Sequence, residues 1–482
     1  MILQVIRFLL ARAIPALINI AALAMYSRWL SPEEYGVYTL VISSVALTSG
    51  FLFQWIGSGL IRFIASESAN RLRYLSASLT LFISILFLAL LLLAVIGLHN
   101  SNISRSLYFA GVALLIAESW HILSWHLAIA ASSPFNFGLQ ITVKSSLSLA
   151  MAGILVHYGY GPLGVVYGVL IGTIVAGLLP PVLRSWQGAR PFGRSTSGVW
   201  QMAKYGAPLC GSIVGAYLIQ VSDRFFLAYY GGAADVGSYA VGYDLATFTI
   251  TSAMMIVNMA AYPLVIRELD KGRIFASARL ASNLNNLLWV TLPLLACLVI
   301  FSTNITSIVL GAEFHETSQR ILPWIAIAAF LNGIRSYHVD VSYHLAKNTI
   351  PIVTILLVSA FVNALLNMAL IPRFSVDGAI AATIISYILA LILSVVFSTR
   401  YGFGLPPLSK TTLPIVSCVV IAAVVSAQFA DKMGIGWLTA QFGIFCVAYL
   451  ICSWYLDIGN IKSKSRSAYS RFAQMIDYLN RK

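Results

Sequence analysis

The chain has 482 residues, of which 59% are hydrophobic and 10% are charged. A soluble domain carries about 25% charged residues, so this composition excludes a cytosolic enzyme, a disulfide-bonded scaffold and a disordered protein. Lys and Arg total 30 against 16 Asp and Glu, giving a net charge of +14. In a membrane protein this excess indicates basic cytoplasmic loops facing anionic lipids, not a nucleic-acid partner.

Apolar runs of about 20 residues follow one another along the whole chain, and each is long enough to cross a bilayer as a helix. Strands of a membrane β-barrel would instead alternate apolar and polar residues. The sequence therefore predicts an all-α polytopic membrane protein. We expect about fourteen transmembrane helices, at residues 8–29, 38–64, 75–97, 107–131, 137–156, 161–183, 206–230, 237–263, 281–303, 320–343, 350–371, 377–399, 412–430 and 435–456.

The basic residues predict the orientation of these helices. With the N-terminus inside, most of them collect at the cytoplasmic face. We therefore expect both termini in the cytoplasm. The longest predicted outer loop, near residues 304–319, is too short to fold into a domain.

A short acid-x-Gly-x-Tyr string occurs twice, as Glu34-Tyr35-Gly36-Val37-Tyr38 and as Asp235-Val236-Gly237-Ser238-Tyr239, and each copy joins two apolar helices. The repeat predicts two six-helix lobes with the same topology, related by an axis along the membrane normal. The expected parts are an N-terminal lobe at 1–183, a basic cytoplasmic linker at 184–205, a C-terminal lobe at 206–400, two extra helices within 401–457 and a basic amphipathic tail at 458–482.

Three segments resemble Wzx-type polysaccharide flippases. Residues 26–38 read YSRWLSPEEYGVY and resemble the family's opening, residues 222–226 read SDRFF and resemble the start of its second lobe, and residues 371–379 read IPRFSVDGA and resemble the junction between its eleventh and twelfth helices. The resemblance extends over the whole chain in helix count and order.

This resemblance implies membership of the multidrug/oligosaccharidyl-lipid/polysaccharide exporter superfamily, with two lobes around a central cavity and transport by alternating access. It implies an undecaprenyl-pyrophosphate-linked oligosaccharide as substrate, moved from the inner to the outer leaflet of the bacterial inner membrane to build O-antigen, capsule or exopolysaccharide. A polysaccharide polymerase and a chain-length regulator would then be the expected partners, besides anionic membrane lipids.

Two arginines lie within predicted spans, Arg224 near the outer end of the seventh and Arg335 near the middle of the tenth. A charged side chain at bilayer depth costs at least about 2.5–3.5 kcal/mol, so such residues usually face a bundle interior or a wet cavity. A guanidinium binds phosphate oxygens through two parallel hydrogen bonds, which makes both arginines candidates for holding a pyrophosphate. The alternative is a purely structural ion pair, for example between Arg224 and Asp223.

Four further basic residues lie nearer helix ends, where long side chains commonly extend to the interface, and are also candidates for a cationic cavity: Arg12, Arg28, Arg62 and Lys144. The acids within spans are candidates for ion coupling or ion pairing: Glu118, Asp223, Asp244 and Asp340. Glu118 shares a helix face with His121, and Asp340 shares one with His344, so either pair could relay a proton or simply hold helices together.

No metal-ligand cluster, phosphate-binding loop or nucleophile motif occurs, so we expect a transporter without cofactor, metal or catalytic residues. Three rival functions stay open. A cation-coupled multidrug exporter would have an interior rich in aromatics and acids, and a peptidoglycan-precursor flippase would share the same helix plan. A membrane-embedded glycosyltransferase or polymerase would need a catalytic acid on an outer loop, where Glu313 and Glu316 are the candidates.

Overall fold

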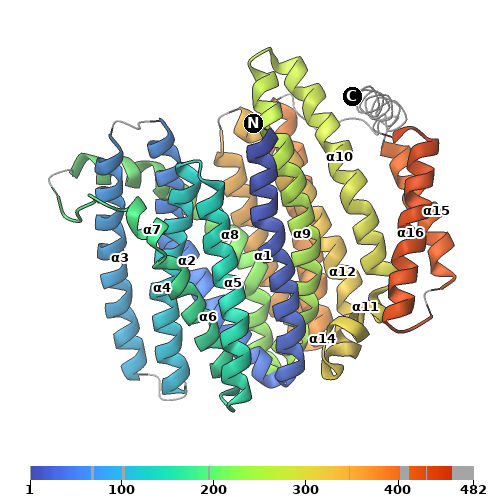
Figure 1. Ribbon diagram of the computed structural model, residues 1–482, viewed down its shortest axis with the longest axis horizontal. Coiled ribbons are helices and arrows are strands. Elements are labelled where there is room, and N and C mark those ends of the chain that lie inside the picture. The colour runs from blue at the N-terminus through green and yellow to red at the C-terminus, as the bar shows by residue number, and fades with distance from the viewer. Residues whose placement is uncertain are drawn as a thin grey trace, which may run out of the picture.

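The computed structural model describes residues 2–66, 70–99, 104–193, 196–346, 348–401, 412–429 and 431–458, with their side chains from residue 13 onward except at 65–66, 98–99, 196 and 208. This part of the chain is helical and contains no strand (Figure 1). The longer helices are α1 (Ile2–Trp29), α2 (Pro32–Ser66), α3 (Arg71–His99), α4 (Arg105–Ala130), α5 (Pro134–His157), α6 (Gly161–Gly177), α8 (Thr196–Tyr230), α9 (Ala233–Leu269), α10 (Arg273–Ile300), α12 (His315–Ile334), α14 (Ile350–Ser398), α15 (Thr412–Ala427) and α16 (Ile435–Tyr455).

The predicted all-α membrane fold is confirmed, since each of the fourteen predicted spans lies mainly in helical segments. Eight helices of the described part are long and apolar enough to cross a bilayer, and α6 and α15 are shorter apolar helices. The predicted tail at 458–482 lies, apart from residue 458, outside the described residues. The segment predicted as a linker contains the end of the short helix α7 (Pro180–Ser185) and the first turns of α8.

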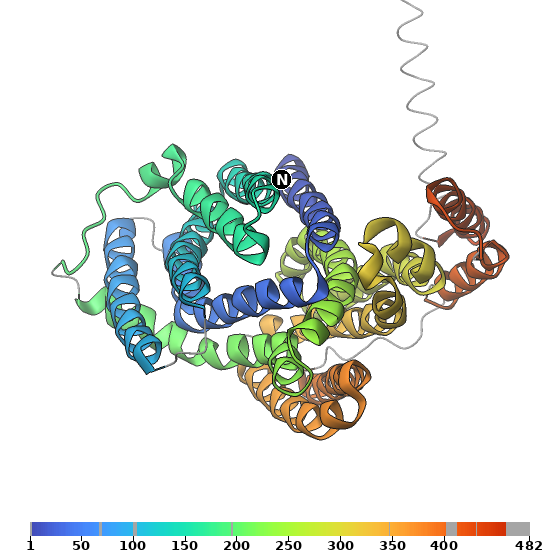
Figure 2. The ribbon, with the colours of Figure 1, turned by 90° about the horizontal axis from the view of Figure 1, so that it is seen from below.

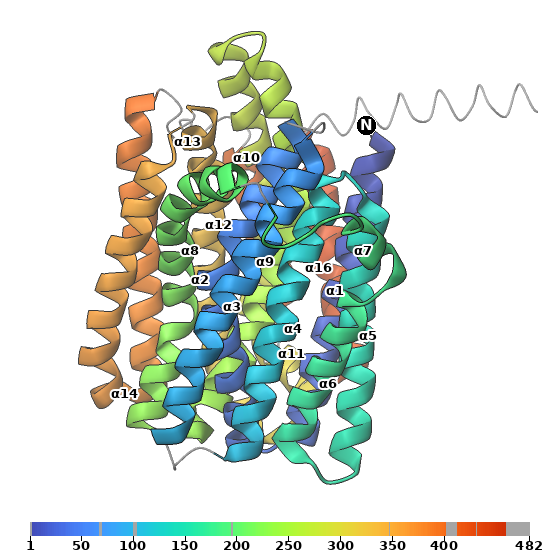
Figure 3. The same ribbon diagram turned by 90° about the vertical axis from the view of Figure 1, so that its left-hand side faces the viewer.

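Three helices differ in detail from the predicted runs. The spans predicted at 350–371 and 377–399 form α14, which is bent at Ser375 with a φ of 46°, and Gly378 packs against the backbone of Leu370 just after the bend. The halves of α14 therefore fold back on each other (Figure 3). A short helix, α11 (Ser302–Val309), and a 3₁₀ turn, η2 (Ala312–Phe314), occupy the predicted outer loop. The tenth predicted span changes from α12 to a π-helical turn, η3 (Arg335–Val339), and then to α13 (Val341–Leu345).

For description, α1–α6 are called the first lobe and α8–α14 the second lobe; α2 packs on α4 and α5 on α6 within the first set, and α8 on α14 and α9 on α12 within the second (Figure 2). Helix α2 packs against both α8 and α9 of the second lobe, and α1 packs against α9. A Cβ on Gly206 of α8 would lie 2.3 Å from the Trp55 ring of α2, so these two helices approach closely because a glycine faces a large aromatic residue.

The two copies of the repeated string meet at one end of the molecule. A Cβ on Gly36 would lie 1.8 Å from the carbonyl oxygen of Ala233, and a Cβ on Gly237 would lie 1.8 Å from that of Pro32. The starts of α2 and α9 therefore touch backbone to backbone, and only glycine fits at either position. Ser31 and Glu34 form a reciprocal cap on α2, with the Ser31 amide donating to the Glu34 carboxylate at 3.0 Å. The repeat thus marks the point where the lobes are held together.

The last two helices lie at the edge of the second lobe, next to α10 (Figures 1 and 2). Tyr449 of α16 donates a hydrogen bond to the carbonyl oxygen of Trp289 at 2.8 Å, and Asn304 of α11 donates to Gln441 at 2.8 Å. Helices α15 and α16 are therefore additions to the second lobe and line neither of the two cavities described below.

Candidate functional site

A cavity of about 470 Å³, here called the central cavity, lies where the two lobes meet. Its lining comes from α1, α2, α5 and α6 of the first lobe and from α8 and α9 of the second. The polar side chains that line it are Asn19, Tyr26, Tyr35, Tyr38, Ser43, Lys144, Ser145, Ser148, Tyr217, Gln220, Arg224 and Asp244. The cavity therefore combines one lysine, one arginine and one carboxylate with hydroxyl and amide groups.

Arg224 reaches the central cavity from α8, and its side chain is buried. Its guanidinium donates to the Asp244 carboxylate at 2.6 Å and to the Ser43 hydroxyl at 3.2 Å, and lies 5.4 Å from the centre of the Tyr243 ring. Since Ser43 belongs to α2 of the first lobe, Arg224 joins the two lobes across the cavity. Its Nε atom is buried and has no hydrogen-bond partner among the described residues.

Asp223 has different surroundings from its neighbour. Its carboxylate accepts a hydrogen bond from the backbone amide of Arg224 at 2.8 Å and another from the hydroxyl of Tyr239. It is fully buried and does not line the central cavity. The guanidinium of Arg224 thus pairs with Asp244 across to α9, while Asp223 holds α8 against α9.

Lys144 reaches the same cavity from α5. Its ammonium donates to both oxygens of Glu118 on α4, at 2.6 and 2.8 Å. Glu118 is therefore engaged by a lysine, and the Nδ1 atom of His121, one turn away, has no hydrogen-bond partner in the described part of the chain. The central cavity thus holds two cations, one from each lobe, and each is paired with a carboxylate.

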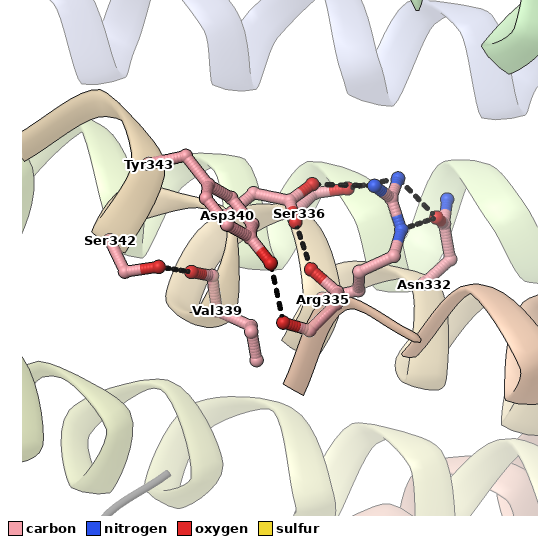
Figure 4. Close-up of polar contacts among 8 residues, drawn as sticks. Asn332, Arg335, Ser336, Val339, Asp340, Ser342 and Tyr343 are labelled. Atoms are coloured by element: carbon pink, nitrogen blue, oxygen red, sulfur yellow. Dashed lines mark hydrogen bonds and ion pairs between the residues drawn. The ribbon is translucent and has the colours of Figure 1, made fainter. Parts of the chain in front are cut away.

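Arg335 lies in a second, smaller pocket of about 220 Å³, here called the second pocket, between α8, α9, α12, η3 and α14. Its guanidinium donates to Asp340 at 2.5 Å, to Asn332 at 2.9 Å and to Ser336 at 2.9 Å, so its charge is neutralised within its own helix (Figure 4). Asp340 also accepts a hydrogen bond from the hydroxyl of Ser394 on α14.

The remaining predicted basic residues are not among those that line either cavity. Arg28 is exposed at the end of α1 and donates to the carbonyl oxygen of Ile308 at 2.5 Å. Arg62 is exposed near the end of α2, with its guanidinium 4.7 Å from the centre of the Tyr205 ring. The side chain of Arg12 lies outside the described residues. The structure therefore brings Lys144, Arg224 and Asp244 together and leaves Arg28 and Arg62 at the ends of the lobes.

Sequence reasoning did not single out the side chains that supply most of the polar lining, such as Tyr26, Tyr35, Tyr217 and Gln220. One signal was available for the tyrosines, because Tyr35 and Tyr38 stand inside the repeated string. For Gln220 the only signal was its position one turn before Arg224, which places both residues on one face of α8.

No group of three or more His, Cys, Asp or Glu side chains that could hold a metal ion occurs among the described residues. The cations, hydroxyl groups and amides of the central cavity offer ionic and hydrogen-bonding contacts, and they can take up an anionic group if the carboxylates give up their cations. A phosphate or pyrophosphate fits this description, because it accepts charge-assisted hydrogen bonds from lysine and arginine.

Comparison with known proteins shows the family to which the chain belongs. Residues 25–319 match the family model described as polysaccharide biosynthesis protein. The chain belongs to this family. It is 21% identical over 458 residues to the probable low-salt glycan biosynthesis flippase Agl15 of Haloferax volcanii, covering 91% of this chain and 92% of that protein.

Solved structures share the fold. Lipid II flippase MurJ in an inward closed conformation has a TM-score of 0.72 at 18% identity, covering 95% of this chain and 99% of that one. An outward-facing multidrug resistance transporter of the MATE family, in the MOP superfamily, has a TM-score of 0.59 at 14% identity, covering 83% and 95%. The expected membership of a polysaccharide family is therefore confirmed by the family model, the fold is shared with these transporters, and the chain is a multi-pass membrane protein.

Proposed function

We propose that this polysaccharide biosynthesis protein is a flippase for undecaprenyl-pyrophosphate-linked oligosaccharide. It would move this substrate from the inner to the outer leaflet of the bacterial inner membrane by alternating access, to supply O-antigen, capsule or exopolysaccharide synthesis. Protein residues would bind and carry the substrate without breaking or forming covalent bonds.

The observation that carries the proposal is that each lobe contributes one cation, Lys144 or Arg224, to a single cavity at the lobe interface. Each cation is paired with a carboxylate, Glu118 or Asp244, at 2.6 Å. Such pairing reduces the cost of keeping charges at bilayer depth while the cavity is empty. An entering pyrophosphate would replace the carboxylates as the partner of the cations, so the ion pairs make the cavity stable when empty and selective for anions.

The proposal also covers the orientation of the chain in the membrane, the movement of its lobes and its partners. The excess of basic residues near the ends of α2, α7 and α9 favours a cytoplasmic location for both termini, because positive residues remain inside. The lobes would move as bodies, with boundaries near 1–183 and 206–400 and a linker at 184–205. Anionic lipids would lie against the basic face, and a polysaccharide polymerase would take up the delivered product.

The proposal is tested by transport in proteoliposomes that contain a fluorescent undecaprenyl-pyrophosphate oligosaccharide, whose outer-leaflet fraction is read by chemical quenching. Arg224→Ala should lower the translocation rate about a hundredfold, since it removes a desolvated charge partner. Arg224→Lys should keep part of the rate because it keeps the charge. Arg320→Ala is the matched control, because Arg320 is exposed and pairs with Asp377 away from the cavity. Normal transport by folded Arg224→Ala would contradict the proposal.

A peptidoglycan-precursor flippase or a cation-coupled drug exporter would have the same fold. The substrate is distinguished by deleting the gene and identifying the lipid-linked intermediate that collects on the inner leaflet. We expect an oligosaccharide intermediate of a surface polysaccharide. Accumulation of the peptidoglycan precursor, or of no lipid-linked sugar, would assign the chain to one of the rivals.

A further inference from the structure

The second pocket differs from the central cavity in its chemistry. Its arginine is already satisfied, because Arg335 donates to Asp340, Asn332 and Ser336. A strongly anionic ligand would have to break these three hydrogen bonds, whose donors and acceptors all lie between residues 332 and 340. The pocket therefore offers neutral groups, although it contains a charged residue.

Hydroxyl and amide groups in the second pocket are left without partners. Gln220 of α8 and Thr247 and Thr251 of α9 line it, and none of the three has a side-chain hydrogen bond within the described residues. Thr249, between the two threonines, instead donates to the carbonyl oxygen of Leu245 at 2.8 Å and does not line the pocket. The unpartnered groups thus face the pocket and are available to a ligand rich in hydroxyl groups.

Two tyrosine rings complete the lining. Tyr243 and Tyr387 are buried, and their hydroxyl oxygens lie 3.5 Å apart at the wall of the pocket. Aromatic rings beside unpaired hydroxyl and amide groups match a pyranose ring, which has an apolar face and a rim of hydroxyls.

The second pocket adjoins the central cavity through two residues. Gln220 lines both, and it precedes Arg224 by one turn of α8, a rise of about 6 Å. Tyr243 lines the second pocket, and its ring also lies beside the Arg224 guanidinium, 5.4 Å from its central carbon. A group attached to an anion at Arg224 would therefore lie within reach of Gln220 and Tyr243.

We infer that the second pocket binds the uncharged sugar attached directly to the pyrophosphate, with Gln220, Thr247 and Thr251 donating to or accepting from its hydroxyl and amide groups. This inference rests on the proposed function, because it places the phosphates at Arg224. The ion pair of Arg335 and Asp340 has a positioning role: it fixes Asn332 and Ser336 at the pocket wall.

The test measures binding to the purified full chain in detergent. The probes are undecaprenyl pyrophosphate without sugar and the same lipid carrying one glucose, galactose, N-acetylglucosamine or N-acetylgalactosamine. At least one sugar should tighten binding about tenfold over the bare lipid, as expected for a few added hydrogen bonds. Equal binding of the bare lipid and of all four glycolipids would overturn the inference.

Variants separate the two sites. The double variant Thr247→Val, Thr251→Val, whose threonines line the second pocket and not the central cavity, should lose the advantage of the preferred sugar and still bind the bare lipid as the wild type does. Thr249→Val is the matched control and should keep the advantage. Arg224→Ala should weaken binding of both lipids. Failure of the wild type to bind either lipid would overturn the proposed function itself, whereas sugar preference unchanged in the double variant would overturn only the inference.

Discussion

At the scale of single residues, each cation of the central cavity is paired with a carboxylate. Lys144 donates to both oxygens of Glu118, and Arg224 is held by Asp244 and Ser43. Breaking such a pair by removing one member leaves an uncompensated charge in a low-dielectric site and costs about 3–5 kcal/mol. Removing one member of a pair would therefore destabilise the fold as well as remove the proposed phosphate ligand, and an experiment must separate these two effects.

The charge reversal Lys144→Glu, Glu118→Lys makes this separation. It keeps an ion pair between α4 and α5 but replaces the cation that lines the central cavity with a carboxylate. We expect thermal stability close to that of the wild type and transport lowered by at least about tenfold, since a carboxylate repels the phosphates. The single variant Lys144→Glu is the control for misfolding. Recovery of transport by the double variant would mean that the pair is only structural.

At the scale of helices, the contact of α2 with α9 closes one end of the lobe interface. Gly36 and Gly237 each face a carbonyl oxygen of the other lobe. At the same end, the Gly311 amide donates to the Ser27 hydroxyl at 3.1 Å, and Arg28 donates to Ile308. The proposed transport by alternating access would require this contact to open, and a stronger contact would open less often.

The variant Gly36→Ala tests this contact. Its Cβ would lie 1.8 Å from the Ala233 carbonyl oxygen, which forces the helices apart and costs about 1–3 kcal/mol. A cysteine at Ala46, in the central cavity of a chain without its native cysteines, should then react faster with an impermeant maleimide applied to the face where α2 begins. Gly443→Ala is the control, because a Cβ there meets nothing within 4 Å. An unchanged reaction rate in Gly36→Ala would contradict a closed end at this contact.

Helix positions followed from the sequence because long apolar runs leave few alternatives in a bilayer. The π-helical turn did not, since it depends on tertiary packing: the Asp340 amide bonds to the Arg335 carbonyl at 2.8 Å, which places residues five apart on one side. In an α-helix of 3.6 residues per turn they would diverge. The partner of Arg224 was likewise hidden, because Asp244 is distant in sequence while Asp223 is adjacent. To know which of the two aspartates pairs with Arg224, one must know how α8 is rotated about its axis relative to α9.

At the scale of the whole molecule, the two lobes differ in what they bring to their shared interface. The first lobe contributes Lys144 to the central cavity, while the second contributes Arg224 and the whole of the second pocket. Movement of the lobes would therefore change the cations around the phosphates while the sugar stays with the second lobe. In this proposal the carried head group would cross the membrane with its negative charge only partly compensated.

This charge movement predicts a dependence on membrane potential. A potential of 100 mV acts on each transferred elementary charge with about 2.3 kcal/mol. In proteoliposomes with an imposed potassium diffusion potential, a negative potential on the side of loading should speed net translocation, and the opposite potential should slow it. A rate indifferent to the potential, with an effect of the proton gradient instead, would favour a coupled proton and restore Glu118 or Asp340 as the relay.

The most direct test of the phosphate site is a cryo-electron microscopy structure of the full chain with undecaprenyl pyrophosphate. The phosphates should lie between the two lobes, within hydrogen-bond distance of Lys144 and Arg224, with the Arg224–Asp244 contact of 2.6 Å lengthened or lost. Phosphate density on the outer surface of the lobes, with both ion pairs of the central cavity intact, would contradict it.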